Sequence, residues 1–323
     1  MTREEIAALR GEMKSAIVAA KKKEDFQETY DKFCELSKNG TLDKSLFRDF
    51  GWLIFYRLRA LPLNMMLQRK RAMLQYFQLK LERPSLLHSL ILSEAVKMKK
   101  NSPSGFRFRD FVSMWELENL RPEDWDKIKL PTGKSRNSLV EILIGTYVRE
   151  IVADKAPATD DFVQLLEKAV SIYKSNPHLP LYKAQVMVSV GKTEDASAFY
   201  KVLLKRWPKK FFLWARAEEL LPPKELSLRI AFLSKAIFHI REQAFLGDIR
   251  LKLAYLLQKQ GLYSYALFEL TQYERYYQSQ NWHIKPWHET LKNLIEGKSQ
   301  GVNTVPTPYA EFLPLADRYI NEL

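Results

Sequence analysis

Three alanines, Ala196, Ala231 and Ala266, recur at an interval of thirty-five residues, each inside an amphipathic helical pattern. A constant period of this length is typical of stacked two-helix repeats. One hairpin cannot bury its apolar face alone, so neighbouring hairpins stack and leave an extended surface that holds partners. The period therefore predicts an all-α chain, an α-solenoid of stacked helical hairpins.

The composition favours helices and a folded core. Hydrophobic residues make up 46% of the chain and aromatic residues 12%, which is enough to build a core. Glycine, at 11 of 323 residues, lies well below its usual share of about 7%. Leu, Lys, Glu, Ala and Gln are frequent, and these residues favour helices.

The single cysteine, Cys34, excludes an intramolecular disulfide and is typical of a reducing compartment. Its place in a helical pattern predicts a core thiol. The charged N-terminus lacks the apolar segment of a signal peptide. No apolar run is long enough to cross a bilayer. We therefore expect a cytoplasmic location and no membrane partner.

The repeat pattern is sharpest in two segments, 181–208 and 249–277. Each predicts a helix, a turn at glycine and a second helix. The middle unit departs from this pattern, because Pro222-Pro223 replaces the glycine turn and Glu219 stands where a small residue is expected. The positions that recur are Ala184, Gly191, Ala196 and Pro208 in the first segment, and Ala254, Gly261 and Ala266 in the last.

These positions resemble the tetratricopeptide repeat, over residues 176–280. The resemblance implies a right-handed solenoid that binds a protein partner along the inner face of its first helices. More distantly, the chain resembles helical-repeat proteins of bacterial conflict and defence systems. The repeat pattern also predicts which residues line the inner groove. These candidate partner-binding residues are Gln185, Arg216, Tyr255, Gln258 and Lys259.

Three regions are expected along the chain. Residues 1–155 form divergent helical hairpins, 156–300 the tetratricopeptide-like repeats, and 301–323 a linker with a C-terminal capping or docking helix. The first helix should begin at Thr2, whose spacing to Glu5 fits a capping box. A break is expected at 102–105, followed by a short helix at about 114–120.

The net charge of +13 is unevenly distributed. Residues 52–109 hold twelve Lys and Arg but only two acids, and 201–216 form a second run without acids. Aromatic residues alternate with Arg in the first of these segments. Such a pattern is typical of single-stranded nucleic-acid binding, in which rings stack on bases and Arg binds phosphate. Alternatively, the rings fill the core while Arg stems cover it. The candidate nucleic-acid-binding residues are Arg57, Arg59, Arg69, Lys70, Arg71, Arg107 and Arg109.

No pattern in the sequence predicts catalysis, a metal or a cofactor. His283 and His288 are five residues apart with Pro286 between them, which does not fit a helical zinc pair. Residues 131–135 lack the first glycine of a P-loop. We expect a non-enzymatic scaffold that binds a protein partner or acidic peptide through a basic concave surface. The alternative is a module that binds RNA or DNA; the oligomeric state stays open.

Overall fold

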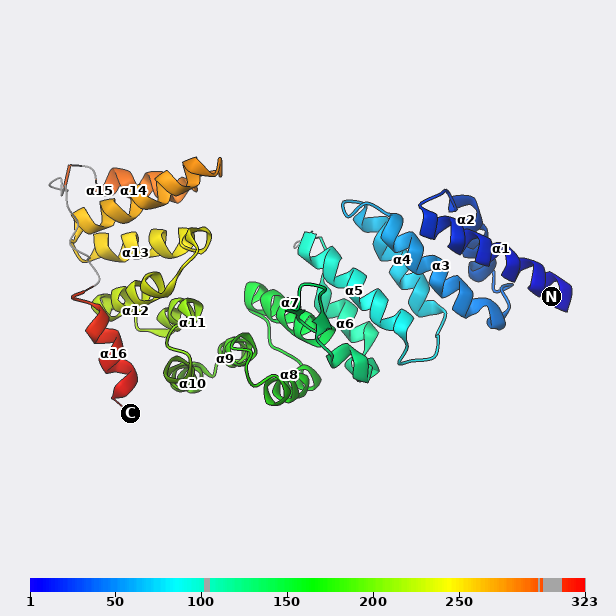
Figure 1. Cartoon of the computed structure of the whole chain (residues 1–323), viewed down its shortest axis with the longest axis horizontal. Helices are drawn as coiled ribbons and strands as arrows, with labels where there is room; N and C mark the ends of the chain where they lie inside the picture. The colour runs from blue at the N-terminus through cyan, green and yellow to red at the C-terminus, as the bar shows by residue number, and fades with distance from the viewer. Residues whose placement is uncertain (102–104, 296, 299–309, 323) are drawn as a thin grey trace. The chain divides into compact units, whose positions relative to one another are not determined.

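The computed structural model describes residues 1–101, 105–295, 297–298 and 310–322 (Figure 1). Within these residues the chain forms sixteen α-helices, five short 3-10 helices and one two-stranded antiparallel hairpin, β1 (Ile128–Lys129) with β2 (Ser135–Arg136). The expected all-α class is confirmed. The chain divides into two compact units, Met1–Lys174 and Ser175–Leu323. The three-region division drawn from the sequence stays a prediction.

The first unit consists of helices that pack against the next helix in the chain and against the next but one. Thr2 caps the first helix with the expected capping box, in which its side chain and that of Glu5 each accept the other's backbone N–H. The elements are α1 (Arg3–Lys22), α2 (Gln27–Lys38), η1 (Lys44–Leu46), α3 (Phe47–Ala60), α4 (Met66–Gln78), α5 (Leu86–Asn101), α6 (Phe108–Trp115), η2 (Leu117–Asn119), η3 (Pro122–Trp125), α7 (Leu139–Asp154) and α8 (Asp160–Ile172).

The short helix expected at about 114–120 is wrong in its position, because α6 begins at Phe108 and ends at Trp115. The cause is a buried carboxylate on α7. Glu150 accepts the backbone N–H groups of Phe108 and Arg109 at 2.9 and 3.0 Å, which satisfies the start of α6. Of the break expected at 102–105, residues 102–104 lie outside the described residues.

The second unit contains three consecutive pairs of helices, α9 with α10, α11 with α12, and α13 with α14. Each of these pairs lies side by side (Figure 1). The elements are α9 (His178–Ser189), α10 (Thr193–Arg206), α11 (Phe211–Ala217), η4 (Glu218–Leu220), α12 (Leu226–His239), η5 (Gln243–Phe245), α13 (Gly247–Lys259), α14 (Tyr263–Ser279), α15 (Pro286–Ile295) and α16 (Leu313–Asn321).

The residues that carry the period lie where the sequence pattern predicts. Ala196, Ala231 and Ala266 lie on α10, α12 and α14, and none of the three is exposed to solvent. Gly191 and Gly261 join the helices of the first and last pairs with φ of +80° and +79°, a conformation that other residues adopt only with strain. The middle pair differs, because α11 ends at Ala217 and a 3-10 turn follows.

The C-terminal helix α16 returns to the middle of the second unit, where it packs against α12 and α10. The ring of Tyr319 lies edge-on to Phe232 at 5.5 Å, and Lys235 forms an ion pair with Asp317 at 2.6 Å. Pro314 occupies the first turn of α16, where its missing N–H costs nothing. The linker expected at 301–309 lies outside the described residues. Among the described residues, no helix combines the length and apolarity that crossing a bilayer requires.

We expect that Ala196→Leu destabilises the second unit by about 1–3 kcal/mol, because the larger side chain overpacks a contact with no free space. Ala198→Leu, two residues along the same helix at an exposed position, is the matched control and should change stability by less than about 0.5 kcal/mol. Urea denaturation followed by circular dichroism measures both. Equal effects would contradict close packing at Ala196.

Glu150→Gln tests the buried carboxylate that starts α6. Burial alone would raise the pKa of Glu150, but hydrogen bonds from Lys99 and from the two backbone N–H groups outweigh it and hold the pKa below its usual value. We expect a loss of about 2–4 kcal/mol at pH 7, since an amide removes the counter-charge of the half-buried Lys99 and one of the two carboxylates that pair with Arg109.

A group whose folded pKa is lowered stabilises the protein above its ordinary pKa of about 4.3, and this contribution disappears as the pH falls through the folded value. The difference between wild type and Glu150→Gln should therefore shrink as the pH falls below about 4. Asp154→Asn is the control, since Asp154 meets Arg109 at the surface, where an ion pair contributes about 0–1 kcal/mol. A difference that is independent of pH would contradict the assignment.

Candidate functional site

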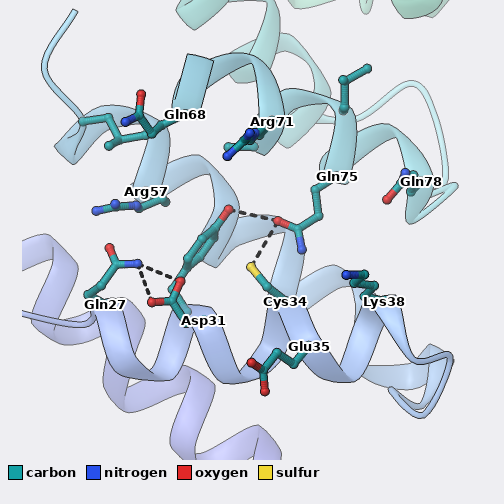
Figure 2. Close-up of a pocket in the computed structure, with 14 residues that line it drawn as sticks. Gln27, Asp31, Cys34, Glu35, Lys38, Arg57, Gln68, Arg71, Gln75 and Gln78 are labelled. Carbon is teal, nitrogen blue, oxygen red and sulfur yellow. Dashed lines mark hydrogen bonds between the residues drawn. The ribbon is translucent and has the colours of Figure 1, made fainter. Parts of the chain in front are cut away.

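A groove of about 620 Å³ runs between α2 and α4 in the first unit, with the last turn of α3 at one end (Figure 2). Polar side chains form two facing rows along it. On α2 the row has helical spacing of four, four and three residues; on α4 the spacing is three, four and three. The rows are Gln27, Asp31, Glu35 and Lys38 on α2, and Gln68, Arg71, Gln75 and Gln78 on α4.

The floor of the groove is held by hydrogen bonds to one amide. The Oε1 atom of Gln75 accepts from the Tyr30 hydroxyl at 2.9 Å and from the Cys34 thiol at 3.2 Å (Figure 2). Because both donors meet the same oxygen, the orientation of the Gln75 amide is defined. Its Nε2 has no partner among the described residues, so this nitrogen can donate to a ligand.

Burial keeps both donors in the floor protonated. It raises the pKa of the Tyr30 hydroxyl, and the neighbouring Cys34 raises it further. Burial likewise raises the pKa of the Cys34 thiol. Cys34 is half-buried on the groove floor rather than in the core, and at neutral pH its thiol is a hydrogen-bond donor and not a thiolate.

Both acids of the groove lie on the α2 wall, together with Lys38. Asp31 accepts two hydrogen bonds at 2.8 Å from the amide of Gln27, and Glu35 lies on the same helix. Across the groove, Arg57 lies over the Tyr30 ring at 5.7 Å and Arg71 is exposed on α4. Neither arginine forms an ion pair within the part of the chain that the structure describes.

The arrangement matches the chemistry of a peptide. A side-chain amide offers two donors and an acceptor, which are the groups that pair with backbone C=O and N–H. Arg binds carboxylates with two parallel hydrogen bonds. The three amides of the α4 row and the guanidinium groups of Arg57 and Arg71 can therefore hold an extended segment by its backbone and select an acidic side chain.

The structure does not bring the predicted basic residues into one cluster. Arg57 and Arg71 share the α2–α4 groove. Lys70 and Arg107 line a second cleft, of about 400 Å³, with Phe106 and Met114. Arg59 borders a third, beside α1. The seven residues that lie together in the sequence thus face several surfaces.

Arg69 is a correction, because it is 1% exposed and cannot reach a partner. Its guanidinium donates to the carbonyl oxygens of Leu58 and Leu61, at the end of α3, and forms an ion pair with Glu94 at 2.8 Å. It therefore caps α3 from α4. Arg109 is also engaged within the protein, because it forms ion pairs with Glu150 and Asp154.

The groove residues projected from the repeat pattern lie on three helices of the second unit. Gln185 is half-buried on α9, and Arg216 on α11 pairs with Glu219 at 3.0 Å. Three residues lie together on α13, where Lys259 lies 5.6 Å from the ring of Tyr255, one turn from Gln258. Their role in binding stays a prediction.

Sequence reasoning missed the two facing polar rows. The signal is present on α4, where Gln68, Gln75 and Gln78 recur with Arg71 at helical spacing. Such a stripe is also typical of an ordinary solvent-facing helix surface. It indicates a binding groove only when a second polar row faces it in the fold. Tyr30 and Cys34 carry no signal of this kind.

Comparison with known proteins adds one match. Residues 177–301 match the family described as a domain of unknown function, DUF7017. The match covers much of the second unit and less than half of the chain. No curated protein and no solved structure shows a significant match.

We expect Arg69→Met to destabilise the first unit by about 3–5 kcal/mol, because it leaves Glu94 buried without the guanidinium that neutralises it and two carbonyls without a donor. The matched control is Arg71→Met, two residues along α4 at an exposed position, which should change stability by less than about 0.5 kcal/mol. Urea denaturation compares them. A small effect at Arg69 would contradict its structural role.

Proposed function

We propose that the chain is a non-enzymatic, cytoplasmic helical-repeat scaffold that binds an acidic segment of a protein partner in the α2–α4 groove. The observation that carries the proposal is the pair of facing polar rows, with Arg71 in the α4 row and Arg57 at one end of the groove, neither of them in an ion pair among the described residues. The oriented Gln75 amide adds a fixed donor to the floor.

The proposal includes a tetratricopeptide-like solenoid in the second unit. Its support is the burial of Ala196, Ala231 and Ala266 at a constant interval, together with left-handed glycine turns in the first and last helix pairs. Each pair packs against the next along the chain, which is how repeat proteins build a continuous core.

An acidic peptide suits this groove better than a polyphosphate. Asp31 and Glu35 line the wall opposite Arg71, and they would repel a backbone that carries one negative charge per residue. A peptide places its acidic side chains one by one, so it can meet the arginines and avoid the acids. The dispersal of the basic set and the burial of Arg69 further disfavour nucleic acid in the first unit.

Selection from a random twelve-residue peptide library against the full chain tests the proposal. We expect enrichment of Asp and Glu, and we expect Arg57→Ala with Arg71→Ala to weaken the selected peptides by about a hundredfold or more, since the two substitutions together remove at least two charged hydrogen bonds of roughly 1.5–3 kcal/mol each. Gln75→Leu should weaken them as well, because the floor loses its donor.

Arg3→Ala with Arg48→Ala is the matched control, since both arginines are exposed in the first unit and do not line the groove. It removes the same charge and should leave affinity within about twofold. Peptides without acidic enrichment, or equal loss in both double variants, would overturn the proposal.

A further inference from the structure

A further cleft, lined by polar and aromatic side chains, lies entirely within the second unit. It lies between the turn that joins α10 to α11 and the turn that joins α12 to α13. Its volume is about 780 Å³. Two sequence segments meet there, Lys209-Lys210-Phe211-Phe212 and Phe238-His239-Ile240-Arg241, with Phe245 beside them. Each segment combines rings with cations, and folding brings both to the lining of one opening.

The rings of the cleft form a continuous series. His178 stacks on Phe212 with ring centres 4.3 Å apart, Phe212 lies edge-on to Phe211 at 5.6 Å, and Phe211 stacks on Phe245 at 5.8 Å. Phe238, on the last turn of α12, also lines the opening. The series thus begins at the start of α9 and ends in η5.

Two of these rings lie largely in solvent. Phe238 is 64% exposed and Phe245 is 55% exposed. Exposing a phenyl ring is unfavourable, since burying one contributes roughly 1.5–3 kcal/mol. Two exposed rings in one cleft are therefore the mark of a surface that a partner covers.

The charge around the rings is positive. Lys209, Lys210 and Arg241 line the cleft and Glu242 is the acid among its lining residues. None of the three cations forms an ion pair within the described residues. Burial, and then the nearby Lys235, lower the pKa of His239, so its ring is neutral at pH 7. The partner must therefore offer negative charge together with flat apolar surface.

We propose that this cleft binds single-stranded nucleic acid, with unpaired bases stacked on Phe238 and Phe245 and phosphates held by Lys209, Lys210 and Arg241. Unpaired bases are flat and follow one another beside a regular row of phosphates, which is the chemistry that these side chains complement. A duplex hides its base faces, so it can use only the cations. An acidic peptide has carboxylates but no flat surface at each charged position. The proposal is independent of the α2–α4 groove.

Fluorescence anisotropy with the full chain tests the proposal at about 150 mM salt, where exposed charges are screened beyond about 8 Å. The probes are labelled twelve-residue oligo(dT) and oligo(rU), an abasic oligonucleotide of the same length, and a duplex. We expect the abasic strand and the duplex to bind at least tenfold more weakly than oligo(dT) or oligo(rU). Equal binding of the abasic strand would overturn the proposal, since it would show charge attraction alone.

Variants separate stacking from charge. Phe238→Ala and Phe245→Ala should each weaken the binding of the single strands by about tenfold, and leave the abasic strand unchanged, because each removes one stacking surface. Lys209→Ala with Arg241→Ala should weaken every probe and reduce the salt dependence. Since Phe238 and Phe245 are largely exposed, these variants should keep the helical circular dichroism of the wild type.

Each variant has a matched control. Leu294→Ala removes an apolar side chain that is 51% exposed on α15, and Lys205→Ala with Lys224→Ala removes two exposed charges that do not line the cleft. These controls should bind as the wild type does. So should Arg57→Ala with Arg71→Ala, which makes a failure of the α2–α4 proposal distinguishable from a failure here. Loss of binding in the controls equal to that in the cleft variants would contradict the site.

Poly-glutamate is the last probe. It carries negative charge without bases, so we expect no displacement of bound oligo(dT) at equal charge concentration. Displacement by poly-glutamate as effective as that by unlabelled oligo(dT) would identify a general polyanion surface and overturn the proposal.

Discussion

Buried carboxylates that hold basic side chains from elsewhere in the same unit are the interaction on which both units depend. Glu94 and Glu150 serve the first unit, and Glu218 and Glu269 the second; all four are at most 3% exposed. Glu218 meets Arg229 and Lys252, from α12 and α13, at the irregular turn of the middle helix pair. Removing one partner from such a pair costs about 2–5 kcal/mol, so each pair restricts the packing of its helices.

These ion pairs change how the positive charge counted along the sequence should be interpreted. Of the twelve basic residues in 52–109, five are held by carboxylates, and three of the acids that hold them, Glu116, Glu150 and Asp154, lie outside that segment. A count of charge along the chain therefore exaggerates the positive field at the surface. The paired residues are Arg69, Arg83, Lys97, Lys99 and Arg109.

The parts of the fold that the sequence predicts are those set by local chemistry. The Thr2 capping box, the turns at Gly191 and Gly261 and the buried alanines follow from spacing within one or two helices. The start of α6 could not be predicted in this way, because Glu150, forty-two residues away from Phe108, determines it. The burial of Arg69 has the same origin, since its partners lie on α3 and α5. The α2–α4 groove also depends on two helices that meet only in the fold.

The two surfaces that we propose as binding sites share one property. Arg57 and Arg71 in the groove, and Lys209 and Arg241 in the cleft, have no carboxylate partner among the described residues. The buried cations Arg69 and Arg250 are paired with carboxylates. The four unpaired cations instead lie at openings that are lined by amides or by rings. The neutral side chains that line each opening then favour different ligands. Amides pair with a peptide backbone, whereas exposed phenyl rings stack with bases. We therefore propose that the neutral side chains beside the unpaired charges, more than the number of charges, determine which ligand each surface binds.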